Sequence, residues 1–129
     1  MKKVFNFILL LIFSQNAFCQ TSQDHFIKGN QYLFEQQYDS SIVYYSKAIE
    51  LDSNLLYAYV HRSEAYEKLG QLKNAVSDRT KCIELGGEDI TLNYSARGDI
   101  FVKLKEFENA IKDYKDCLLY TSDAADEAD

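Results

Sequence analysis

Apolar residues between positions 20 and 116 recur at steps of three and four residues, the spacing that places side chains on one side of an α-helix. Phe26, Gly29, Tyr32 and Leu33 are an example. The chain has 129 residues with no proline and five glycines, so few positions interrupt helices. The pattern predicts an all-α fold and argues strongly against a β-sandwich or a β-barrel.

The helical pattern repeats along the chain at an offset of 34 or 35 residues. Five sets of positions share this offset: 47–51, 81–85 and 116–118; Tyr32, Tyr66 and Phe101; Gly29, Ser63 and Gly98; Tyr38, Leu72 and Phe107; Ser41, Ala75 and Ala110. Gly70 and the pair Gly86-Gly87 are expected to end helices, because glycine adopts the left-handed cap conformation at little cost. One pair of helices cannot bury its apolar face alone, so a repeat of this length predicts stacked pairs.

These positions resemble the tetratricopeptide repeat, in which small and aromatic residues alternate at fixed spacing. The resemblance covers residues 22–116 and divides them into repeats 22–55, 56–89 and 91–116, the last of them incomplete. It implies a right-handed solenoid of antiparallel helix pairs whose first helices line a concave face. The chain departs from the pattern in lacking tryptophan, in the replacement of the closing proline by Ser53 and Gly87, and at Arg79, where an aromatic residue is usual.

Residues 1–19 resemble a bacterial export signal. Lys2 and Lys3 precede an apolar run of about ten residues, which is too short for the ~20 that span a bilayer, and a small-residue site ends at Cys19. The mature protein is therefore expected to begin at Gln20 and to be periplasmic or extracellular, and the 129 residues given are expected to contain no transmembrane segment. A lipoprotein signal with Cys19 acylated is the less favoured alternative, because the preceding Phe18 is large.

The last residues, 117–129, are interpreted as a non-native tail. Positions 117–127 read CLLYTSDAADE, which resembles the translation of an adapter used in shotgun sequencing libraries. On this interpretation the natural chain is interrupted inside the second helix of the third repeat. The alternative is an ordinary acidic tail rich in alanine.

No constellation of catalytic or metal-binding residues is found in the sequence. The chain has no glycine-rich phosphate loop, no paired histidines at metal-ligand spacing and no serine elbow. His25 and His61 lie one per repeat without a predicted set of ligands. We therefore expect no enzyme activity, no cofactor, no metal and no small-molecule substrate. The formal charge of −6, with basic residues interleaved among acidic ones, also argues against a nucleic-acid partner.

Function is expected to reside in the first helix of each repeat, because the resemblance implies that these helices line a groove for an extended peptide or a partner helix. The groove positions are Gln23, Phe26, Asn30, Leu33 and Phe34 in the first repeat, Tyr57, Val60, Glu64, Glu67 and Lys68 in the second, and Leu92, Ser95, Asp99, Val102 and Lys103 in the third. Whether Phe26, Phe34 and Tyr57 contact a ligand or pack against neighbouring helices is left open.

Some members of this family hold a terminal carboxylate with lysines and asparagines, and this chain lacks most of that set. Phe26 stands where the first lysine belongs, Leu92 and Ala96 stand at later positions, and only Asn30 fits. The sequence therefore predicts no carboxylate clamp.

Two functional hypotheses follow. The first is a non-catalytic scaffold that binds a protein or peptide of unknown identity. The alternative is the N-terminal sensory or docking region of a longer signalling protein or exported enzyme.

We predict that protein recovered from the periplasm begins at Gln20, because the charge and apolar pattern of residues 1–19 is that of a cleaved signal. N-terminal sequencing of the recovered protein measures this directly. Recovery of the chain in the cytosol with Met1 retained would contradict the prediction.

Overall fold

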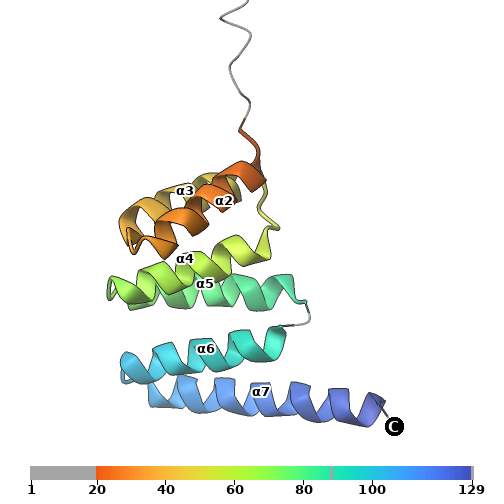
Figure 1. The fold of residues 1–129 in the computed structure, drawn as a ribbon. Helices are drawn as coiled ribbons and strands as arrows, with labels where there is room; N and C mark the ends of the chain where they lie inside the picture. The colour runs from red at the N-terminus through yellow and green to blue at the C-terminus, as the bar shows by residue number, and fades with distance from the viewer. Residues whose placement is uncertain (1–19, 88, 129) are drawn as a thin grey trace, which may run out of the picture.

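The computed structural model describes residues 20–87 and 89–128, and these form helices and connecting turns with no strand (Figure 1). The helices are α2 (Ser22–Phe34), α3 (Tyr38–Leu51), α4 (Leu56–Lys68), α5 (Leu72–Leu85), α6 (Ile90–Lys103) and α7 (Phe107–Glu127). They form the antiparallel pairs α2/α3, α4/α5 and α6/α7, which lie one below another in Figure 1. The predicted all-α solenoid of about three helix pairs is confirmed, whereas the predicted signal segment lies outside the described residues.

The helices begin and end where local chemistry favours it. Thr21 caps α2, since its hydroxyl accepts a hydrogen bond from the Asp24 amide at 3.1 Å while the Asp24 carboxylate accepts one from the Thr21 amide at 2.8 Å. Gly70 follows α4 with φ = 72°, and Gly86 and Gly87 follow α5 with φ = 74° and 109°, so glycines end both helices as predicted. The predicted left-handed cap is wrong at Gly86, since its ψ of −154° lies outside the left-handed helical region. The helix α7 continues through positions 117–127, and the interpretation of this segment as non-native stays a prediction.

The turn after the first helix has the same backbone conformation in all three pairs, although only the second pair has a glycine there. Gln36 and Lys105 stand at the positions equivalent to Gly70 and have φ = 59° and 63°. Residues other than glycine adopt this left-handed conformation at a cost of roughly 1 kcal/mol. The connection within each pair is therefore fixed by the geometry of the pair rather than by the turn residue.

Within the first and third pairs, a glycine allows the two helices to approach closely. A Cβ atom on Gly29 would lie 2.6 Å from the Tyr45 ring, and one on Gly98 would lie 2.7 Å from the Tyr114 ring. The equivalent position on α4 is Ser63, which has a Cβ atom, and its pair carries Arg79 in place of the tyrosine. Arg79 in place of the tyrosine is thus accompanied by Ser63 in place of the glycine that faces the tyrosine in the other two pairs.

Two arginines join neighbouring helix pairs. Arg62 on α4 donates hydrogen bonds to both carboxylate oxygens of Asp78 on α5, at 2.8 and 2.7 Å, and a third to the Ser46 hydroxyl on α3 at 2.8 Å. Asp78 is 4% exposed, so the ion pair is largely screened from water. The Arg62 guanidinium therefore contacts α5, the partner helix of its own pair, and α3, the second helix of the pair before it.

The same arrangement recurs one repeat later. Arg97 on α6 binds both oxygens of Asp113 on α7, at 2.8 and 2.7 Å, and donates to the Thr80 hydroxyl on α5 at 2.8 Å. In the first pair the equivalent positions hold Lys28 and Tyr44, and the Lys28 ammonium lies 4.9 Å from the centre of the Tyr44 ring. A cation–π contact thus replaces the ion pair in the helix pair that has no described neighbour before it.

An apolar cluster fills the junction between the first two pairs. Tyr45 and Ala48 of α3 and Ala58 of α4 are fully buried. Phe26, Leu33, Ile49 and Leu55 pack around them and are partly buried.

None of the helices in residues 20–87 and 89–128 is long and apolar enough to cross a membrane.

We predict that Gly29→Ala destabilises the protein by about 1–3 kcal/mol, because the new methyl group would overlap the Tyr45 ring. At an open helical site the same change would stabilise by up to about 1 kcal/mol, so the sign of the effect is diagnostic. Urea unfolding followed by circular dichroism measures it. Ser63→Ala is the matched control and should change stability by less than about 1 kcal/mol, since a Cβ atom is already present there. An increase in stability for Gly29→Ala would contradict the close approach of α2 and α3.

We predict that Arg97→Lys lowers the free energy of unfolding by about 2–3 kcal/mol, because lysine keeps the charge but cannot bind both Asp113 oxygens and Thr80 at once. The reverse change in the first pair, Lys28→Arg, is the control and should have an effect within about 0.5 kcal/mol, since an arginine also fits over an aromatic ring. Equal unfolding midpoints for Arg97→Lys and the native chain would show that the fork geometry of Arg97 does not contribute.

Candidate peptide-binding face

The predicted groove positions lie on α2, α4 and α6 and form rows across the stack, because the helices repeat with a fixed offset. We call this surface the first-helix face. From the start of the helices to their ends, the rows are Gln23, Tyr57 and Leu92; Phe26, Val60 and Ser95; Asn30, Glu64 and Asp99; Leu33, Glu67 and Val102; and Phe34, Lys68 and Lys103. Side chains of this face join neighbouring first helices: Lys103 on α6 pairs with Glu67 on α4, and the Phe26 ring on α2 lies against His61 on α4.

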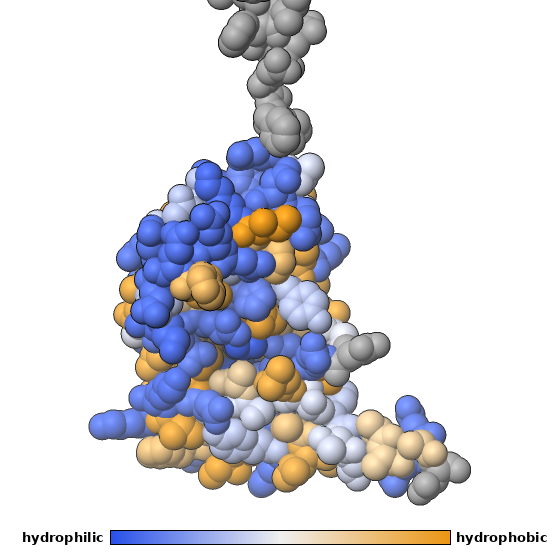
Figure 2. Space-filling view, viewed as in Figure 1, coloured by the Kyte–Doolittle hydropathy of each residue, from blue (hydrophilic) through white to orange (hydrophobic). Residues whose placement is uncertain are grey.

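Several large apolar side chains of this face are exposed to water. Phe34 is 89% exposed, Leu92 62%, Tyr57 52% and Val102 43%. In Figure 2 the surface seen in Figure 1 is largely hydrophilic, with separate apolar patches over all three helix pairs. Removing apolar surface from water at an interface makes the free energy of binding more favourable by about 25 cal/mol per Å².

Two predicted groove residues, Phe26 and Leu33, instead take part in packing. Both lie against the buried cluster between the first two pairs. The Phe26 ring has its centre 6.0 Å from that of Tyr45 and 5.8 Å from that of His61 on α4. Phe26 therefore helps to join α2 to α4, and its partly buried ring leaves less surface for a ligand than Phe34 or Tyr57 does.

The middle row of the first-helix face is held from behind by the second helix of each pair. The Tyr45 hydroxyl donates to Asn30 Oδ1 at 2.8 Å, and the Tyr114 hydroxyl donates to Asp99 Oδ1 at 2.7 Å. In the second pair, Arg79 replaces the tyrosine and its Nη2 lies 3.8 Å from Glu64 Oε1. Each middle-row side chain is thus held in position by a residue that lies 15 positions later in the sequence.

Glu64 has a second partner on its own helix, since the His61 Nδ1 atom lies 3.3 Å from Glu64 Oε2. This hydrogen bond, together with the charges of His61, Arg79 and Lys68, lowers the pKa of Glu64 below its ordinary value although partial burial opposes the shift. The Glu64 carboxylate is therefore ionised at neutral pH. Burial and the Glu64 charge both raise the pKa of Tyr45, so its hydroxyl stays a donor to Asn30.

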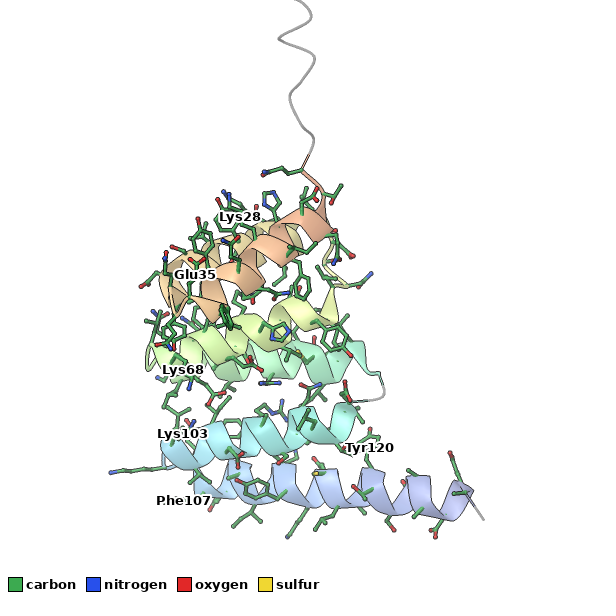
Figure 3. The ribbon with its side chains drawn as sticks, viewed as in Figure 1. Lys28, Glu35, Lys68, Lys103, Phe107 and Tyr120 are labelled. Carbon is green, nitrogen blue, oxygen red and sulfur yellow. The ribbon has the colours of Figure 1, made fainter. Side chains whose placement is uncertain are left out.

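A depression of about 450 Å³ opens between α4 and α6, lined by Glu64, Glu67, Lys68 and Lys103. Lys103 Nζ lies 2.6 Å from Glu67 Oε2, which joins the two helices across the depression. Figure 3 shows Lys68 and Lys103 at the same edge of the stack, at the ends of α4 and α6. A polar group of a ligand would compete with this ion pair at Glu67 and Lys103, whereas Lys68 forms no ion pair among the described residues.

Tyr57 is linked to the third pair by its hydroxyl, which donates to Asp89 Oδ2 at 3.3 Å. The ring stays half exposed, so this contact orients Tyr57 on the surface and does not bury it. Val60 and Ser95 are partly buried in the next row. The structure thus links Tyr57 to the start of α6 and places Phe34, Lys68 and Lys103 at the ends of α2, α4 and α6.

The described residues offer little for covalent chemistry. Residues 20–87 and 89–128 contain no group of three or more histidine, cysteine or acidic side chains placed to hold a metal ion. Cys82 is fully buried, and burial raises its pKa to about 11, so the side chain is a thiol rather than a nucleophilic thiolate at neutral pH. The arrangement is suited to holding a partner by surface contact.

Sequence reasoning missed a buried polar contact between the second and third pairs. Arg79 is 5% exposed and donates through Nη1 to Asn93 Oδ1 at 3.0 Å, and Asn93 is 1% exposed. Arg79 Nε and Asn93 Nδ2 are buried without a hydrogen-bond partner among the described residues. The sequence did mark Arg79 as unusual, because it stands at a position that is aromatic in the repeat pattern. Nothing in the sequence pointed to Asn93 as its partner.

The sequence model of the family described as Tetratricopeptide repeat matches residues 25–55, 56–85 and 93–123. Among curated proteins, the chain is similar to Hsp70-Hsp90 organizing protein 3 of Arabidopsis thaliana, with 41% identity over 73 residues that make up 57% of this chain and 13% of that protein. It is also similar to mitochondrial import receptor subunit TOM70 of Saccharomyces cerevisiae, with 40% identity over 58 residues, 45% of this chain and 9% of TOM70. The chain therefore spans about a tenth of the length of these curated relatives.

Two solved structures show the same fold. The first TPR of Spaghetti (RPAP3) bound to the HSP90 peptide SRMEEVD is 31% identical, with a TM-score of 0.69 and coverage of 77% of this chain and 78% of that one. MamA superposes with a TM-score of 0.77 over 83% of this chain and 62% of that one, at 19% identity. The three matched segments together make up more than half of the sequence, and the chain belongs to the tetratricopeptide repeat family.

Proposed function

We propose that this chain is a non-catalytic scaffold that binds a peptide or a partner helix on the first-helix face. The observation that carries the proposal is the exposure of Phe34, Tyr57, Leu92 and Val102 on equivalent helices of a stack whose middle-row side chains are already held in position. A surface of fixed polar groups with exposed apolar side chains loses little conformational entropy when a partner binds.

The comparisons support the same proposal. The similar first TPR of Spaghetti binds a peptide, and 78% of that domain is covered by this chain. We transfer only the general mode of binding, because Phe26 and Leu92 stand where this chain would need lysine or asparagine to hold a terminal carboxylate.

The setting of this scaffold is a second part of the proposal. The pattern of residues 1–19 favours action outside the cytoplasm. The small share of the curated relatives that the chain covers favours the alternative in which these repeats are the docking region of a longer protein. Both settings use the first-helix face in the same way.

We predict that Tyr57→Ala weakens the binding of a peptide selected on this protein at least about tenfold, which corresponds to ~1.4 kcal/mol. An aromatic side chain buried at an interface contributes roughly this much or more, and Tyr57 is half exposed before binding. Fluorescence anisotropy with the labelled peptide measures the affinity.

Val43→Ala is the matched control for Tyr57→Ala, since Val43 is 50% exposed on α3 and lies outside the first-helix face. It should leave the affinity unchanged. Undiminished binding by Tyr57→Ala would place the peptide elsewhere, and loss of helical circular dichroism in Tyr57→Ala would show that Tyr57 supports the fold.

A further inference from the structure

We propose that the partner of the first-helix face carries a cationic side chain between apolar ones, and that Asp99 binds this cation. The inference rests on the proposed function and adds the chemistry of the ligand. It follows from the distribution of charge and apolar surface on α4 and α6.

Asp99 is an exposed carboxylate that is held in place by a neutral group. The Tyr114 hydroxyl donates to Asp99 Oδ1 at 2.7 Å, and this bond raises the pKa of Tyr114 and keeps its proton on the tyrosine. No cationic side chain of residues 20–87 and 89–128 forms an ion pair with Asp99, as the ion pairs of the described chain involve other carboxylates. Its carboxylate is therefore fixed in position and forms no ion pair within the described residues.

The other carboxylates of the first-helix face are already neutralised. Glu64 lies 3.3 Å from His61 and 3.8 Å from Arg79, whose guanidinium is buried. Glu67 forms the ion pair with Lys103 at 2.6 Å. A cation on a ligand would have to displace these partners from Glu64 or Glu67, whereas Asp99 can accept it directly.

Apolar side chains lie on both sides of Asp99 along α6. Leu92 precedes it by seven residues and Val102 follows it by three, so both share its face of the helix. Both are exposed, and at 1.5 Å per residue they lie about 10 Å and 5 Å from Asp99 along the axis. Tyr57, held toward α6 by Asp89, adds a third apolar surface near Leu92. A cationic side chain flanked by apolar residues fits this series.

The same charges disfavour an acidic ligand. The peptide SRMEEVD that binds the similar domain of Spaghetti carries two glutamates and one aspartate against one arginine. On this chain its acidic residues would meet Asp99, and of the two lysines of the first-helix face Lys103 is already paired with Glu67, which leaves Lys68 alone to balance them. Repulsion between like charges adds to the discrimination between partners that attractive contacts provide.

Selection from a random dodecapeptide library displayed on phage tests the proposal, with the full chain as bait. We expect enriched peptides to carry lysine or arginine next to apolar residues and to have a net positive charge. Parallel selection on Asp99→Asn should lose the charge preference but keep the apolar one. Enrichment of neutral or acidic peptides on the native chain would overturn the inference while leaving the scaffold function intact. Absence of any enrichment over the Tyr57→Ala chain would overturn both.

The most enriched peptide, synthesised with a fluorescein label, then gives the affinity of each variant by anisotropy. Asp99→Asn should bind at least about tenfold more weakly at low salt and show a shallower salt dependence, because one charge–charge contact is lost. The variant is expected to fold, since Asn30 accepts the equivalent tyrosine hydrogen bond in the first pair. Glu50→Gln, which removes an exposed carboxylate from α3, is the control and should bind like the native chain. Equal affinity for Asp99→Asn and the native chain would overturn the inference.

Discussion

Arg62 and Arg97 provide the contact on which the relative placement of the helix pairs depends. A single pair of amphipathic helices cannot bury its apolar face, so each pair must be fixed against the next. Each arginine binds a buried carboxylate in its own pair and a hydroxyl on the pair before it. The bidentate ion pair fixes the direction of the guanidinium within its own helix pair, so its remaining N–H group is aimed at the hydroxyl of the pair before it. The alignment of equivalent residues into rows across α2, α4 and α6 is a consequence of this fixed placement.

The helix pairs were predictable from the sequence because their period of 34 or 35 residues is carried by many positions at once. The turn at Gly70 was predictable because glycine adopts the left-handed conformation at little cost, whereas the same conformation at Gln36 and Lys105 was not, since neither residue type favours it. On the first-helix face, the sequence located the exposed Phe34 and Tyr57. It did not reveal that Phe26 packs against His61, or that Asp99 is held by Tyr114, because such contacts join different helices and leave no local spacing.

The second helix pair differs from its neighbours in a set of linked positions. Its small residue is Ser63 rather than glycine, and Arg79 replaces the tyrosine that would need the glycine. Arg79 contacts two residues, Glu64 on α4 and Asn93 on α6. The tyrosine at the equivalent position of the other pairs donates one hydrogen bond, to Asn30 in the first pair and to Asp99 in the third. The buried guanidinium neutralises Glu64, while the first pair needs no such charge beside Asn30. In the second pair, therefore, the charge of the middle-row carboxylate is balanced by an arginine on the helix behind it, where the other two pairs have a neutral tyrosine.

The arginine contacts also define which segments of the gene can be exchanged without loss of structure. Arg97 finds Asp113 on its own pair, and from the preceding pair it requires only a hydroxyl, which is Thr80 in this chain and Ser46 at the equivalent position. A recombination event that removed residues 56–90 as one block would bring Arg97 to Ser46 with both carboxylate contacts intact. Duplication of the same block would regenerate the junction in the same way. Loss or gain of a partial repeat would instead leave a buried carboxylate without its arginine, so whole repeats are the units in which such a chain can grow or shrink.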